Sequence, residues 1–142
     1  MLGDMTDDLR DFNSHLIEEF RANDGKLSGR FENSPILLLT TTGARTGLGH
    51  TTPMMYRLDG DRLLVFASNA GAVKPPDWFF NLSANPKVLV EIGEETFEAV
   101  AVVTEGEERE RLFAETVVNY PFFADHQRQA GRDIPVVAIE RR

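Results

Sequence analysis

Two tight-turn signals, each between two strand-like runs, constrain the fold of this chain most strongly. The dipeptides are Asp59-Gly60 and Gly93-Glu94. The four flanking runs are residues 50–57, 62–67, 87–92 and 96–103. Two-residue Asp-Gly and Gly-containing loops are typical of β-hairpins, in which neighbouring strands are antiparallel. The sequence therefore predicts an antiparallel sheet and argues against the alternating strands and helices of a parallel one.

Two further strands are predicted at residues 36–39, which are all apolar, and at residues 134–139. A short run that is apolar throughout is typical of a strand buried on both faces. Pro53 lies inside the run 50–57, and proline has no N–H for a ladder hydrogen bond, so we expect an edge strand or a bulge there. Six short strands favour closure into a small antiparallel barrel, because closure removes exposed edges.

Helical patterns surround the predicted strands. Residues 6–24 carry apolar side chains at helical spacing, with Thr6 as a candidate cap and Gly25 as a candidate stop. Shorter helices are predicted at 77–82, capped by Asp77, and at 107–118, with a short helix or turn at 120–128. The prediction is a single α+β domain over residues 1–142, with an N-terminal helix at 6–24 and a barrel over 34–142.

Composition excludes several classes of protein. The net charge of −8 argues against nucleic acid as a partner, although residues 43–87 carry five Lys and Arg against three acids. The chain has no Cys, which removes disulfides and thiolate metal sites and fits a reducing cytoplasm. The three His residues lack metal-binding spacing, so no metal site is expected. The predicted N-terminal helix is acid-rich, which does not favour contact with a membrane surface.

Small residues and hydroxyls gather where two predicted strands end. Thr40-Thr41-Thr42 leads into Gly43-Ala44-Arg45-Thr46-Gly47, and Ala67-Ser68-Asn69-Ala70-Gly71 follows a later strand. Turns of this kind leave backbone N–H groups free, and Arg45 adds a fixed fork of donors, so together they predict an anion cradle. Each segment alone is also compatible with an ordinary tight turn, and Trp78, which follows, with a core residue.

The order and spacing of these segments resemble the deazaflavin-dependent nitroreductase family of small oxidoreductases. The resemblance is most specific over residues 40–86 and extends to Asn119-Tyr120-Pro121 and to residues 133–137. It implies a split β-barrel of the FMN-binding type that holds the deazaflavin coenzyme F420. It further implies hydride transfer from reduced F420 to an electron-poor organic acceptor, such as a quinone, an enone or a nitro compound.

The resemblance assigns roles to particular residues. The first turn would meet the phosphate and charged tail of the coenzyme, the strand at Pro53 would lie along its ring, and the second loop would donate to the polar edge of the ring. The residues implied for the cofactor are Thr42, Gly43, Arg45, Thr46, Gly47, His50, Pro53, Met54, Met55, Ala67, Ser68, Asn69, Ala70, Gly71, Trp78 and Asn81. Those implied for the substrate are Tyr120, Phe123 and His126, and the catalytic candidates are Tyr120 and Ser68.

This chain departs from the family pattern at several of these positions. Ala44 and Asn69 stand where members often carry basic residues, and Phe123 and His126 stand where some members have tyrosines. We therefore predict poor reduction of bulky nitroimidazoles. Two alternatives remain at this stage: an FMN-dependent split-barrel oxidoreductase, and a non-catalytic barrel that binds a cofactor or a lipid. The expected protein is a cytoplasmic monomer or homodimer with a small-molecule partner; peripheral contact with a membrane is left open but not favoured.

Overall fold

The computed structural model describes the backbone of residues 2–142 and, from Asp11 onward, the side chains. A seven-stranded antiparallel sheet has the order β2-β1-β5-β6-β7-β4-β3. The strands are β1 (Ile36–Thr42), β2 (Gly49–Met55), β3 (Arg57–Asp59), β4 (Arg62–Phe66), β5 (Lys87–Ile92), β6 (Glu95–Val103) and β7 (Val136–Arg141). The helices are α1 (Leu2–Ala22), α2 (Asp77–Ala84), α3 (Gly106–Asn119) and α4 (Phe122–Ala130), with 3-10 turns η1 (Gly29–Phe31) and η2 (Asn69–Gly71).

The sheet is curled but not closed. The place where it stays open affects the positions of the residues predicted for the cofactor. β2 and β3 are its two edges, yet only Tyr56 separates them in the chain. Met55 pairs with Ile36 of β1, whereas Arg57 pairs with Leu64 of β4. The chain thus joins the two edges at Tyr56, and the described strands show no pairing between β2 and β4. This opening is what the predicted split barrel requires.

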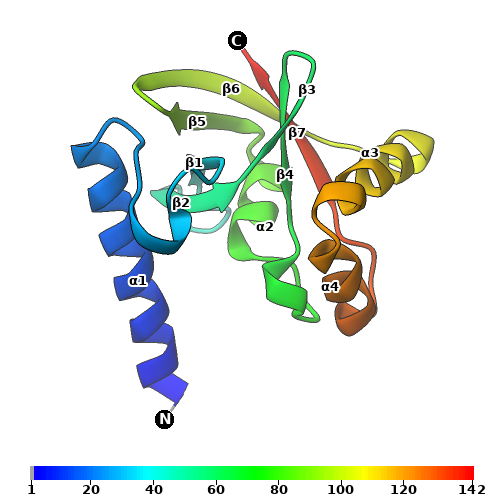
Figure 1. Cartoon of the computed structure of the whole chain (residues 1–142), viewed down its shortest axis with the longest axis horizontal. Coiled ribbons are helices and arrows are strands. Elements are labelled where there is room, and N and C mark those ends of the chain that lie inside the picture. Colours follow the sequence, from blue (N-terminus) through cyan, green and yellow to red (C-terminus); the bar gives the residue numbers. More distant parts are fainter. Residues whose placement is uncertain (1) are drawn as a thin grey trace.

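The concave face of the sheet holds the main core. Leu37 and Leu39 of β1, Val88 and Val90 of β5 and inward residues of β4, β6 and β7 are buried there. Trp78 and Leu82 bring α2 into the same cluster, so α2 packs within the curl (Figure 1). The hydrophobic effect of burying these aliphatic side chains fixes α2 against the sheet.

Two groups of helices cover the convex face. Phe20 of α1 packs with Ile36 and Leu38 of β1, which confirms that β1 is buried on both faces. α3 and α4 cover β4 and β7 on the opposite side of the molecule through Leu112, Phe123 and their neighbours (Figure 1). Among the described residues, no helix combines the length and hydropathy that crossing a membrane requires.

Most predicted elements are confirmed, with shifted bounds. α1 begins at Leu2, so Thr6 lies within the helix and cannot cap it, and α1 ends at Ala22 before Gly25. The cap of α2 is Pro76, while Asp77 lies in the first turn. The run 50–57 is divided between β2 and β3, because its last residue pairs with a different partner. Pro53 lies on the edge strand β2, as predicted.

Candidate functional site

The turn between β1 and β2 leaves part of its backbone available to a ligand. The N–H of Gly43 donates to the carbonyl of Leu48 at 2.7 Å, and the N–H of Gly47 donates to the carbonyl of Gly43 at 2.9 Å. Within the described residues, the N–H groups of Arg45 and Thr46 have no acceptor. Exposed N–H groups at a tight turn attract anions, so this geometry fits the predicted cradle.

Two contacts hold the turn in this shape. The side-chain oxygen of Asn81 accepts the N–H of Ala44 at 3.0 Å, and its amide group donates to the Thr41 hydroxyl at 3.3 Å. A Cβ on Gly43 would lie 2.5 Å from the Thr46 hydroxyl oxygen and 2.9 Å from His50 Nε2, so a larger residue there would have to displace both side chains. Asn81 thus connects α2 to the turn and positions its backbone.

Arg45 is exposed on this turn and has no carboxylate partner among the described residues. The two other arginines of the predicted positive region differ from it, and its two lysines do not. Arg57 and Arg62 are paired with acids, whereas Lys74 and Lys87 have no ion pair in the described part of the chain. Arg45 is therefore the guanidinium of this region whose donors are available to an anion.

The second loop has an unusual backbone. Asn69, Ala70 and Gly71 all have left-handed φ values, of 49°, 54° and 84°. Each such conformation in a residue other than glycine costs about 1–3 kcal/mol, and strain of this kind is found mostly at functional sites. In the described structure the N–H groups of Ser68, Asn69 and Ala70 have no acceptor. Three successive free donors suit an electron-rich ligand edge.

The residues predicted on β2 face opposite sides. Met54 packs against the concave core, whereas Met55 packs against the α1 cluster on the convex face. Alternation along a strand requires this separation. Met54 is thus directed toward the concave core, and Met55 is directed toward α1. In the same β1–β2 ladder, Pro53 lies opposite Leu38. Trp78 is 8% exposed and belongs to the concave core.

An aromatic group forms where α3 meets α4. The rings of Tyr120 and Phe122 are 6.1 Å apart, and those of Phe122 and His126 are 5.5 Å apart. Phe123 is 5% exposed and stacks on Phe66 at the end of β4, with ring centroids 4.8 Å apart. His126 Nδ1 is buried and has no hydrogen-bond partner among the described residues. A buried nitrogen of this kind is costly unless a ligand or water satisfies it.

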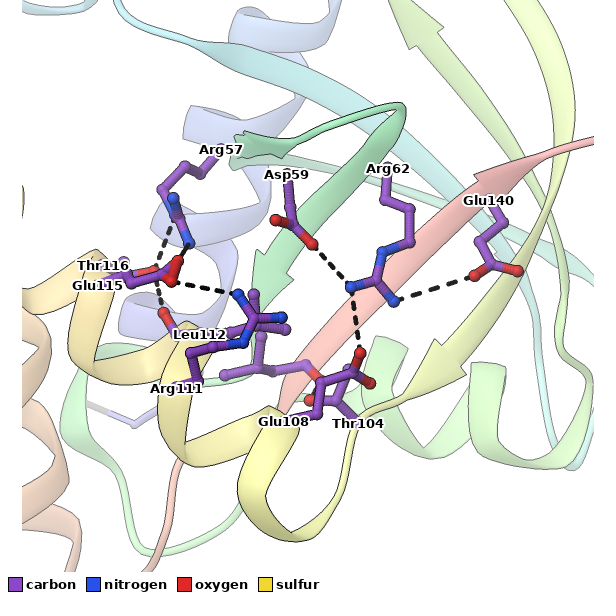
Figure 2. Close-up of polar contacts among 11 residues, drawn as sticks. Arg57, Asp59, Arg62, Thr104, Glu108, Arg111, Leu112, Glu115, Thr116 and Glu140 are labelled. Atoms are coloured by element: carbon purple, nitrogen blue, oxygen red, sulfur yellow. Dashed lines mark hydrogen bonds and ion pairs between the residues drawn. The ribbon is translucent and has the colours of Figure 1, made fainter.

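A network of ion pairs and hydrogen bonds between side chains connects the β3–β4 hairpin to α3 (Figure 2). Arg57 donates to the Thr116 hydroxyl at 3.0 Å and pairs with Glu115 at 3.4 Å. Arg62 pairs with Asp59 at 2.7 Å and with Glu108 at 3.3 Å. The hydrogen bond from Arg62 lowers the pKa of Asp59. These pairs neutralise two cations of the positive region and hold in place the helix that ends just before Tyr120.

A pocket of about 290 Å³ opens beside the ends of β1 and β5. Its lining includes Thr40, Thr42, Lys87, Leu89 and Arg142. Thr42 is the predicted cofactor residue in this lining, and the second loop does not reach it. In the described residues no group of three His, Asp or Glu side chains could hold a metal ion.

Two arginines of the C-terminal region carry structural roles that the sequence reasoning missed. Arg109 is 6% exposed, and it donates to the Ile134 carbonyl and to the Gln127 side chain. Arg132 donates to two backbone carbonyls of the second loop, at Ala67 and Ser68, and to two just after it, at Ala72 and Val73. Their signal in sequence is weak, because an isolated arginine near a turn is usually a surface residue.

Comparison with known proteins places this chain among its relatives. The profile of the F420H(2)-dependent quinone reductase family matches residues 14–141. An F420H(2)-dependent quinone reductase of Mycobacterium tuberculosis is 34% identical over 127 residues, which are 87% of this chain and 85% of the relative. The chain belongs to the F420H(2)-dependent quinone reductase family. This membership confirms the predicted family, the oxidoreductase class and, at the level of the family, F420 as the cofactor in place of FMN.

Solved structures agree with this assignment. An F420-H2 dependent reductase has a TM-score of 0.68 and 39% identity, over 75% of this chain and 94% of that chain. A domain-swapped dimer has a TM-score of 0.70 and 36% identity, over 95% of this chain and 98% of that chain. A structure named after pyridoxamine 5'-phosphate oxidase, from Listeria innocua, is 19% identical over 75% of this chain and 83% of that chain. Its TM-score of 0.53 shows the shared fold alone. The predicted split-barrel class is confirmed.

Proposed function

We propose that this protein transfers a hydride from reduced F420 to a quinone-type acceptor. The observation that carries the proposal is a pair of loops with free donors, at residues 43–47 and 67–71, in a member of the quinone reductase family. Enones and nitro compounds are further acceptors of the same chemical character. Reduced F420 supplies the hydride when it is bound, and the chain supplies binding, orientation and a proton.

The first turn fits the phosphate end of the coenzyme. Arg45 offers a guanidinium without an intramolecular carboxylate partner, and the N–H groups of Arg45 and Thr46 are free in the described structure. Charged donors combined with backbone N–H groups are the usual protein ligands of phosphate. Thr42, Gly47 and His50 belong to the same turn or its flanks and are proposed to shape this contact.

The concave face and the second loop fit the ring end. Met54 lies half-buried on the concave face, and the N–H groups of Ser68, Asn69 and Ala70, which have no acceptor in the described structure, supply donors for a polar ring edge. Met55 faces α1 in this structure, so its proposed share in binding is through the backbone of β2. The indole of Trp78 forms part of the core from which this surface is built.

The aromatic group at residues 120–126 fits the acceptor. Tyr120 is half-buried, and no hydrogen bond engages its hydroxyl within the described residues. Such a hydroxyl can orient a carbonyl oxygen or donate a proton to it. His126 adds a buried ring nitrogen without a partner, which an acceptor hydroxyl or carbonyl could satisfy. Phe123 contributes from the core beneath them rather than from the surface.

Steady-state turnover tests this function. Purified protein is mixed with reduced F420 and a small quinone, and the return of the oxidised deazaflavin absorbance is followed. We expect quinone-dependent oxidation that is faster than with reduced FMN and faster than with a bulky nitroimidazole acceptor. Equal rates with and without protein would instead favour a non-catalytic carrier, and turnover with reduced FMN alone would favour the flavin alternative.

We also propose a homodimer that works in the cytoplasm. The support for the dimer is the 36%-identical relative that forms a domain-swapped dimer. The N-terminal end of α1 extends away from the sheet, as an exchanged element would (Figure 1). The lack of Cys fits a reducing compartment. Light scattering after gel filtration measures the oligomeric state, and a mass of one chain at micromolar concentration would exclude the dimer.

A further inference from the structure

The loop of residues 67–73 has a backbone shape that side chains disfavour, since Asn69 and Ala70 have left-handed φ values. Two hydrogen bonds within the loop, from the N–H groups of Gly71 and Ala72, hold its single turn. Gly71 lies against α4, since a Cβ there would be 3.1 Å from the side chain of Gln129. The segment between α4 and β7 adds contacts from outside the loop.

Arg132 contacts both ends of this loop. Its Nη1 and Nη2 atoms donate to the carbonyls of Ala67 at 3.3 Å and Ser68 at 3.2 Å. Its Nε donates to the carbonyls of Val73 at 2.9 Å and Ala72 at 3.3 Å. A planar guanidinium with fixed donor directions can make these contacts at once, whereas an ammonium cannot.

The charge of Arg132 is not neutralised by a carboxylate within the part of the chain that is described. Burial lowers its pKa, although an arginine still remains charged. Within the described residues, its hydrogen-bond acceptors are four backbone carbonyls at the two ends of the loop. Because all of these bonds go to one loop, they point to a role in shaping it.

The contacts of Arg132 also direct the donors of the loop. A peptide unit is planar, with its C=O and N–H pointing in opposite directions. Since the carbonyls of Ala67 and Ser68 point toward Arg132, the N–H groups of Ser68 and Asn69 point away from it. These N–H groups are among those with no acceptor in the described residues.

We propose that Arg132 is a positioning residue that clamps residues 67–73, so that the donors of Ser68 and Asn69 face the cofactor. This inference rests on the proposed function for the identity of the ligand. The clamp itself is a property of the protein without ligand, and it can be measured separately.

The test compares Arg132→Lys and Arg132→Met with the control Arg128→Met. Arg128 lies in the last turn of α4, is exposed, and within the described residues pairs with Asp125. Hydrogen exchange of residues 67–73 is measured in the protein without ligand, and the Kd for F420 is measured well below each Tm. Arg132→Lys keeps the charge but loses the fork.

Both Arg132 variants are expected to exchange faster in this loop alone and to bind F420 roughly 10-fold or more weakly, as the loss of charge-assisted hydrogen bonds implies. Arg128→Met should match the wild type. The proposal is overturned if the Arg132 variants bind F420 within twofold of that control, or if Arg132→Lys fully restores binding. It is also overturned if exchange rises uniformly over the chain, or if neither Arg132 variant folds. If wild-type protein does not bind F420, the proposed function and the positioning role both fail, while loop exchange still reports whether the clamp exists.

Discussion

Arg45 is exposed, and its charge has no intramolecular carboxylate partner in the described chain. Arg45→Ala should weaken F420 binding by roughly 10- to 150-fold, since a charge-assisted hydrogen bond is worth about 1.5–3 kcal/mol. The Tm without ligand should barely change, because an exposed arginine adds little to stability. The loss should shrink as salt rises. Arg30→Ala removes the same charge outside the turn and serves as the control. Unchanged affinity for Arg45→Ala at low salt would show that the anion cradle is misplaced.

Tyr120 presents a hydroxyl beside an aromatic group, and the proposed role of that hydroxyl can be isolated. Tyr120→Phe should lower kcat and kcat/KM together, on the order of 10-fold, if the hydroxyl acts in the transition state. Tyr56→Phe is a matched control, because Tyr56 is also half-buried but packs on the concave core. A rise in KM with unchanged kcat would reduce Tyr120 to a packing residue, and unchanged kinetics would remove it from the site.

The sequence could predict the chemistry of single residues better than their orientation. Glycine and threonine at the turn and Arg45 after a buried strand are local signals, and they predicted a turn with free donors. The opposite directions of Met54 and Met55, and the burial of Phe123, depend on which faces helices later cover. The face that a helix will later cover cannot be read from the residue itself.

At the scale of elements, α2 and the first turn act as one unit through Asn81. Asn81→Ala removes both hydrogen bonds of this side chain and leaves the N–H of Ala44 unpaired. We expect a loss of about 1–3 kcal/mol of stability and weaker F420 binding, because the turn is no longer held. Asn85→Ala, at the exposed end of the same helix, is the control. If Asn81→Ala bound F420 with wild-type affinity in an equilibrium titration, the turn would not belong to the binding site.

The β3–β4 hairpin offers a prediction for pH. The hydrogen bond from Arg62 lowers the pKa of Asp59, so the folded state favours the carboxylate more than the unfolded state does. Its stabilisation is therefore full above the ordinary pKa of about 3.9 and is lost as the pH falls through the lower, folded value. Asp59→Asn should have a lower Tm than the wild type at neutral pH, and this difference should disappear in acid. Asp61→Asn, which changes an exposed neighbour, should show no such difference; a constant Tm gap for Asp59→Asn across the pH range would contradict the account.

The elements themselves were largely predictable, and their ends were not. Tight-turn residues fixed both hairpins, and Pro53 placed β2 at an edge. The run 50–57 looked continuous, yet it divides at Tyr56 because its two ends pair with different strands. Local patterns contain strand preference but no information on pairing partners, and it is the pairing that creates the split.

At the scale of the whole molecule, we propose that the split holds a deazaflavin between two donor-rich loops. Arg109 and Arg132 contact backbone carbonyls far away in sequence, on the C-terminal side of the proposed site. Long-range contacts of this kind could not be anticipated from the chain alone. They are present without a ligand, so the proposed site should have its shape before the cofactor binds.

Equilibrium titration of F420 and of FMN into the protein without ligand tests this claim most directly. The account predicts saturable binding of F420 with one site per chain and much weaker binding of FMN, and it predicts that raising the salt weakens F420 binding in the wild type more than in Arg45→Ala. FMN binding as tight as F420 binding, or F420 binding that does not depend on Arg45, would contradict it.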